Sequence, residues 1–201
     1  YKDLVIPIED DLVDFIFDAR GGKEREMEFD YKWPYPVDPE VFDDEYSSVF
    51  FIIVSIYPNS EISAPTNVTG LTGPIYGGFA KVDIKIEYKP GTDLNDHYKD
   101  VVGQLRNTLA HEIHHLTQDE PLKRPDCPYL PEQEGRGNAA YFTSACEIPA
   151  FVMGFRAEAN HLDVQVRDLM KDYLNNYVKI NALSSDEAGE VFDAWTGHSF
   201  A

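Results

Sequence analysis

The chain has 201 residues, 43% of them hydrophobic, and a formal net charge of −19 at pH 7. This length and composition suffice for one domain with a buried core, while the acidic charge excludes binding to nucleic-acid phosphates. Because no apolar run approaches the roughly 18 residues that a membrane span requires, we expect a soluble protein with neither nucleic-acid nor membrane partners.

The sequence pattern of residues 1–92 predicts mainly β-sheet. Residues 25–31 (REMEFDY) alternate between polar and apolar, and residues 48–57 form a continuous apolar run that is typical of a central strand. Gly, Pro, Ser and Asn dominate 59–78, which indicates a long loop. Residues 79–88 (FAKVDIKIEY) alternate strictly, with charged side chains on one face, so we expect a half-buried strand near a sheet edge.

Residues 93–201 predict mainly helix. Apolar residues recur at steps of three and four through 93–119, with Asp93 as the expected N-cap and Pro121 as the helix stop. The remaining segments are a Pro- and Gly-rich loop at 121–138, a helix at 145–177 and a short helix at 186–195. Because strands precede helices and no linker divides them, the chain predicts an α+β fold in one domain, 1–201.

Three of the six histidines lie in the five residues HEIHH. His111, Glu112 and His115 spell H-E-x-x-H on a predicted helix, where residues four apart share one face. Both imidazoles can therefore bind one zinc ion (Zn2+). Glu112 reaches the rim of the same site and can accept a proton from the attacking water. We predict His111 and His115 as zinc ligands and Glu112 as the catalytic base.

His114 offers an alternative ligand pair, because it lies three residues after His111 and such pairs also meet on a helix. This pair would leave Glu112 without its usual partner. We therefore expect His114 to pack nearby or to support the site.

A catalytic zinc site needs a third protein ligand and an open position for water. The long metzincin pattern is excluded, because the chain has Gln118 and Pro121 where that pattern has Gly and His. The downstream candidates for the third ligand are Glu147, Glu158, His161 and Asp163.

Glu147 is the preferred third ligand. It is an acid within an otherwise apolar helical segment, 141–155, where a buried carboxylate needs a partner or a metal. The alternative is that Glu147 closes a capping box with Ser144, which would also place Pro149 in the first turn of the helix. His161 lies about four helical turns beyond Glu147, so the two residues cannot bind the same ion.

Two segments together resemble the gluzincin-type zinc metallopeptidases: LAHEIHHLTQ at 109–118 and YFTSACEIPAFV at 141–152. They also resemble small metallopeptidases encoded in bacteriophage genomes. The resemblance covers 108–157. It departs from the fuller gluzincin pattern at Cys146 and Phe151, where that pattern has Asn and Asp.

The resemblance implies a zincin-like fold, in which a mixed sheet lies beside the active-site helix and the second long helix. An edge strand would run along the cleft, and we expect 79–88 to be that strand. The implied activity is zinc-dependent hydrolysis of a peptide or protein substrate, with His111, His115 and Glu147 as ligands. The candidates for stabilising the negative charge of the transition state are Tyr141, Arg156 and His161.

Two other functions remain open from the sequence. The first is a phage virion structural or assembly protein that keeps the metallopeptidase-like domain and binds other virion proteins. The second is a metal-dependent toxin or immunity-type effector.

Overall fold

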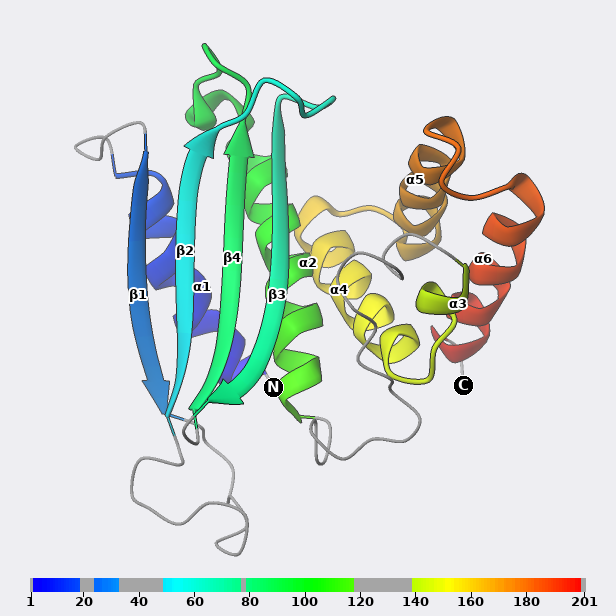
Figure 1. Ribbon diagram of the computed structural model, residues 1–201, viewed down its shortest axis with the longest axis horizontal. Helices are drawn as coiled ribbons and strands as arrows, with labels where there is room; N and C mark the ends of the chain where they lie inside the picture. Colours follow the sequence, from blue (N-terminus) through cyan, green and yellow to red (C-terminus); the bar gives the residue numbers. More distant parts are fainter. Residues whose placement is uncertain (1, 19–23, 33–48, 77–78, 118–138, 200–201) are drawn as a thin grey trace, which may run out of the picture.

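Figure 1 shows the fold in a computed structural model, which describes residues 2–18, 24–32, 49–76, 79–117 and 139–199. One mixed sheet has the strand order β1-β2-β4-β3, with β1 Arg25–Lys32, β2 Val49–Pro58, β3 Thr66–Tyr76 and β4 Phe79–Tyr88. Within these ranges the helices are α1 Lys2–Ile16, the 3-10 helix η1 Leu94–His97, α2 Tyr98–Thr117, α3 Ala139–Phe142, α4 Glu147–Leu162, α5 Val166–Lys179 and α6 Ser185–Ser199. The predicted α+β class is confirmed, and the loop predicted at 121–138 lies outside the described residues.

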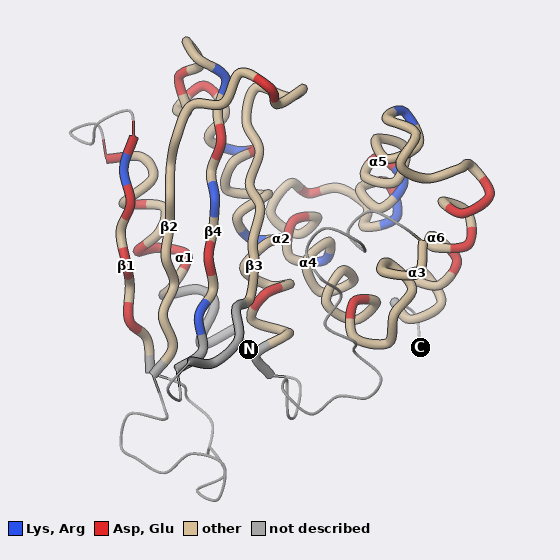
Figure 2. Tube along the Cα trace, in the orientation of Figure 1, with Lys and Arg blue, Asp and Glu red and all other residues tan. Residues whose placement is uncertain are grey.

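The sheet contains the three predicted strands, but one of them has a different position. β1 and β2 pair antiparallel, β2 and β4 pair parallel, and β4 and β3 pair antiparallel. The prediction that 79–88 forms an edge strand is therefore wrong, because β4 lies between β2 and β3. Figure 2 shows charged residues alternating along β4. The residues between them, Val82, Ile84 and Ile86, are buried in the core with residues of α1 and α2, so the charged side chains lie on the other face of the sheet. The charge pattern therefore marks the sheet face opposite α1 and α2.

The prediction of a loop at 59–78 is wrong for residues 66–76, which form the edge strand β3. Its glycines and Pro74 led to the loop prediction, whereas edge strands tolerate proline because one row of N–H groups faces away from the ladder. The β-branched Thr66, Val68 and Thr72 suit a strand, and pairing with β4 supplies the partner that the local sequence does not reveal.

Helix α1 was not predicted. Its Ile8, Leu12 and Ile16 recur every four residues and are fully buried against the covered face of the sheet. The side chains of Glu9 and Arg106 form an ion pair with an N···O distance of 2.6 Å, which joins α1 to α2. These contacts place both helices on the same side of the sheet (Figure 1).

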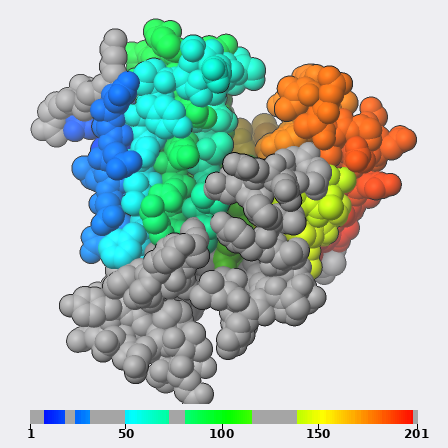
Figure 3. Space-filling view, in the orientation of Figure 1, coloured from blue at the N-terminus to red at the C-terminus, as the bar shows by residue number. Residues whose placement is uncertain are grey.

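The described residues form two hydrophobic cores. The first lies between the sheet and the helices α1 and α2. The second joins α3, α4, α5 and α6 around Trp195, whose indole N–H donates to the main-chain oxygen of Phe142 at 2.9 Å. In Figure 3, parts of the strands are visible at the surface on the side away from α1 and α2, with the described helices of the second core beside them. Among the described residues, no helix combines the length and apolar character needed to cross a membrane.

The helix predicted at 93–119 is confirmed as η1 and α2. The Asp93 carboxylate accepts a hydrogen bond from the main-chain N–H of Asn95 at 2.9 Å, which caps η1. The helix predicted at 186–195 is confirmed as α6, which is longer at both ends.

The prediction of one helix at 145–177 is wrong, because the chain forms α4 and α5 with a break between them. Asp163 ends α4 in the left-handed conformation, with φ of 58°. The N–H of Val164 then bonds to the carbonyl of Ala159 at 3.1 Å, as in a Schellman ending. An aspartate tolerates this conformation better than most residues, so the helical periodicity alone missed the break.

Helices α2 and α4 cross closely, and Gly154 is the residue that permits it. A Cβ at Gly154 would lie 2.9 Å from the main-chain oxygen of Asn107 on α2. The Asn107 amide also donates to Glu158 on α4 at 2.6 Å. Any larger residue at 154 would therefore push the two helices apart.

We predict that Gly154→Ala destabilises the protein by about 1–3 kcal/mol, because the added methyl group meets main-chain atoms that cannot move freely. Gly189→Ala is the matched control, since it is also a helical glycine but nothing lies within 4 Å of an added Cβ. The control should be neutral or more stable by up to about 1 kcal/mol. Urea unfolding of both variants measures the difference, and equal stability of the two variants would contradict the proposed crossing.

Candidate metal centre

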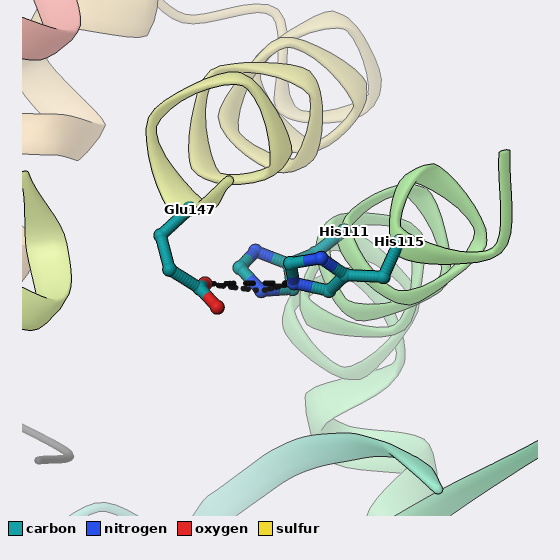
Figure 4. A group of neighbouring side chains, drawn as sticks. All are labelled: His111, His115 and Glu147. Atoms are coloured by element: carbon teal, nitrogen blue, oxygen red, sulfur yellow. Dashed lines mark hydrogen bonds and ion pairs between the residues drawn. The ribbon is translucent and has the colours of Figure 1, made fainter. Parts of the chain in front are cut away.

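Three side chains from two helices converge on one point (Figure 4). His111 and His115 lie one turn apart on α2, and Glu147 is the first residue of α4. Glu147 Oε2 lies 3.3 Å from His111 Nε2 and 3.5 Å from His115 Nε2. The two Nε2 atoms are 3.0 Å apart. Among the described residues, no other group of three His, Cys, Asp or Glu side chains is arranged to hold a metal ion.

The spacing of these three atoms suits a metal ion. Ligand atoms about 2.0–2.1 Å from a tetrahedral zinc ion lie about 3.3 Å from one another. The separations of 3.0, 3.3 and 3.5 Å are close to this value. Two imidazole nitrogens and one carboxylate oxygen also form a donor set that divalent metals accept. The group could therefore hold a metal ion without rearrangement of the two helices.

The electrostatics of Glu147 support the same conclusion. Its Oε2 atom is buried and makes no hydrogen bond, which is costly for a carboxylate oxygen unless a positive group compensates. Burial alone would raise the pKa of Glu147, but the neighbouring imidazoles of His111 and His115 outweigh it and hold that pKa well below its usual range. The carboxylate is therefore charged and directed at both imidazoles, where a cation would complete its partners.

A second Ser-x-x-Glu sequence in the chain shows what Glu147 would do as a cap. At the start of α6, the Glu187 carboxylate accepts from the main-chain N–H of Ser184 at 2.8 Å, which closes a capping box. At the start of α4, the N–H of Ser144 instead bonds to the carbonyl of Tyr141 at 3.2 Å. The Ser144 hydroxyl still accepts from the N–H of Glu147 at 3.3 Å. The carboxylate of Glu147 thus turns from the cap to the histidines.

The aromatic side chain of Phe151, which itself packs on Trp195, packs against the ring of His111. Phe151 meets it edge to face at 4.6 Å between ring centroids, and stacks on Trp195 of α6 at 4.8 Å. Phe151 occupies the position where the fuller gluzincin pattern has Asp. In this chain, packing against the second core therefore orients His111.

Glu112 is separate from the three converging side chains. Its side chain is 7% exposed, and the hydroxyl of Thr72 on β3 donates to its Oε2 atom at 2.7 Å. Thr72 is not among the residues predicted from the sequence, because the glycines and the proline of its segment are typical of a loop. The β-branched residues of that segment were the available signal.

The other predicted candidates lie elsewhere. Glu158 accepts from Asn107, and Asp163 forms the end of α4. His161 lies about 21 Å along α4 from Glu147, at 1.5 Å per residue, and Arg156 is exposed on the same helix. Tyr141 is the nearest candidate, because its ring packs against Phe151 at 6.0 Å. His114 is half-buried on α2 and is not one of the three converging residues.

We predict that the purified protein binds one divalent metal ion per chain. Glu147→Gln should weaken binding about 100-fold or more, because it replaces a charged ligand by a neutral amide. Glu187→Gln is the matched control, since it alters the other Ser-x-x-Glu glutamate, and it should leave metal affinity unchanged. His114→Ala should also bind normally. Titration calorimetry measures each affinity, and a loss with His114→Ala would favour the alternative ligand pair.

None of the family models, curated proteins or solved structures compared with this chain matches it. The resemblance to gluzincin-type and phage-encoded metallopeptidases therefore stays a prediction, and the candidate centre rests on its residues and their geometry.

Proposed function

We propose that the chain is a zinc metallopeptidase of gluzincin type, in which His111, His115 and Glu147 hold the metal and Glu112 is the catalytic base. The observation that carries this proposal is the convergence of three ligand atoms at tetrahedral spacing, with a buried glutamate that is not a ligand directly after His111 in the chain. Zinc is the metal that best suits two imidazoles and one carboxylate with a position left for water.

The residues divide the chemistry between them. When bound, zinc supplies Lewis-acid polarisation and makes water acidic enough to lose a proton near neutral pH. The Glu112 carboxylate accepts the proton of the attacking water and then donates it to the leaving amine. Burial of Glu112 excludes competing water from that carboxylate.

A zincin-like fold accounts for the position of the sheet relative to α2. β3 is the last strand of the described sheet and carries Thr72 beside Glu112. The main-chain N–H of Val68 bonds to the Gln104 side chain on α2 at 3.0 Å, so Val68 belongs to a non-hydrogen-bonded pair of the β3–β4 ladder. By alternation, the N–H and C=O groups of Gly70 and Thr72 also point away from β4. An extended peptide could pair with these groups and pass Glu112.

The proposal predicts peptide cleavage that depends on both the metal and Glu112. The zinc-loaded protein should cleave members of an unstructured peptide library, and a chelator should abolish cleavage until zinc is restored. Glu112→Gln should retain one zinc per chain but lose about 10²–10⁴-fold in turnover, because an amide cannot accept the proton. Mass spectrometry of the products and metal analysis of both proteins measure these effects.

Two outcomes would count against the proposal. Zinc binding without cleavage of any peptide would favour the virion structural alternative, in which the domain survives without turnover. Equal cleavage by the wild-type protein and Glu112→Gln would remove Glu112 from the reaction.

A further inference from the structure

Strand β3 contacts Glu112 at Gly70 and at Thr72. These residues lie two apart on the strand, so they share one face of the sheet. From these contacts we infer that Thr72 is a positioning residue, which fixes the Glu112 carboxylate so that Oε1 is the oxygen that takes up the proton. This inference rests on the proposed function for its chemistry. The position of the carboxylate itself can be tested without any activity.

The hydroxyl of Thr72 selects one carboxylate oxygen. It donates to Glu112 Oε2 at 2.7 Å and also lies 3.2 Å from the main-chain oxygen of the same residue. A hydroxyl has one proton, and a charged acceptor makes the stronger and shorter bond. The bond to Oε2 is therefore the dominant one, and it leaves Oε1 as the oxygen without this donor.

The absence of a side chain at Gly70 makes room for the Glu112 carboxylate. A Cβ at Gly70 would lie 2.8 Å from Glu112 Oε1 and 2.7 Å from Glu112 Cγ, and 2.5 Å from Thr108 Cγ2. The carboxylate therefore lies against the bare main chain of Gly70. Any side chain at residue 70 would displace Glu112 from the orientation that Thr72 holds.

Anchoring one oxygen matters because a glutamate side chain has three rotatable bonds. A free side chain would lose rotamer entropy each time it met a substrate. A base that is already oriented avoids this cost, and small misplacements of reacting groups lower rates strongly. Thr72 thus connects the edge strand, where a peptide would pair, to the group that would act on that peptide.

The first test uses the metal-free protein and needs no cleavage. Thr72→Val should lower the urea midpoint in the wild-type background but have a much smaller effect in a Glu112→Ala background, where the acceptor is absent. Thr69→Val is the matched control, because Thr69 lies on the same strand with an exposed side chain. The control should give the same shift in both backgrounds. Equal losses for Thr72→Val in the two backgrounds would overturn the inference.

The second test uses turnover by the zinc-loaded protein. Thr72→Val should lower kcat about tenfold or more with little change in KM and an unchanged zinc content, and Thr72→Ser should recover most of the rate because it keeps the hydroxyl. An unchanged kcat in Thr72→Val would overturn the inference. Absence of cleavage by the wild-type protein would instead count against the proposed function, and the unfolding test would still decide where Thr72 holds Glu112.

Discussion

The contact between α2 and α4 at Gly154 and Asn107 is the constraint on which the candidate centre depends. His111 and His115 share a turn of α2, so their spacing follows from helix geometry alone. Glu147 comes from α4, and its distance to both imidazoles depends on how closely the two helices pack. Because residue 154 is a glycine, α4 can approach α2 closely enough for Glu147 to lie near both imidazoles. A residue two turns away from Glu147 therefore controls the third ligand.

The buried charge of Glu147 gives this packing its electrostatic consequence. A carboxylate oxygen without a hydrogen bond is costly in a protein interior. Glu147 could instead have capped its own helix, as Glu187 does in the other Ser-x-x-Glu sequence. At α4 the Glu147 carboxylate does not form this capping bond, and it lies instead next to the imidazoles of His111 and His115. This exchange is favourable where a cation neutralises the carboxylate, which is why Glu147 supports a metal centre better than a structural cap.

The sequence predicted those parts of the fold and site that depend on local pattern. Helix α2 and strands β1, β2 and β4 follow from periodicity, and the shared face of His111 and His115 follows from their spacing. Glu147 was preferred as the third ligand because it is an acid in an apolar segment, and its distance to the histidines depends on the packing of α4 against α2. The parts that failed depend on distant partners. β3 needs β4 to become a strand, Phe151 needs the second core to orient His111, and Asp163 breaks a helix whose apolar pattern continues. Thr72 was missed for the same reason, because its role exists only once β3 lies against α2.

The two edges of the sheet differ in a way that bears on where a peptide could pair. β1 has five charged residues among its eight, whereas β3 has none in eleven (Figure 2). Charged edge strands resist the addition of another strand, because pairing would bring their charges together and desolvate them. β3 carries no charged residue, and Pro74 with the register shift between Gly73 and Tyr76 interrupts only the end of this strand. The regular part of β3 is also the part that contacts Glu112. The uncharged edge next to Glu112 is therefore the edge along which the proposed peptide substrate would pair.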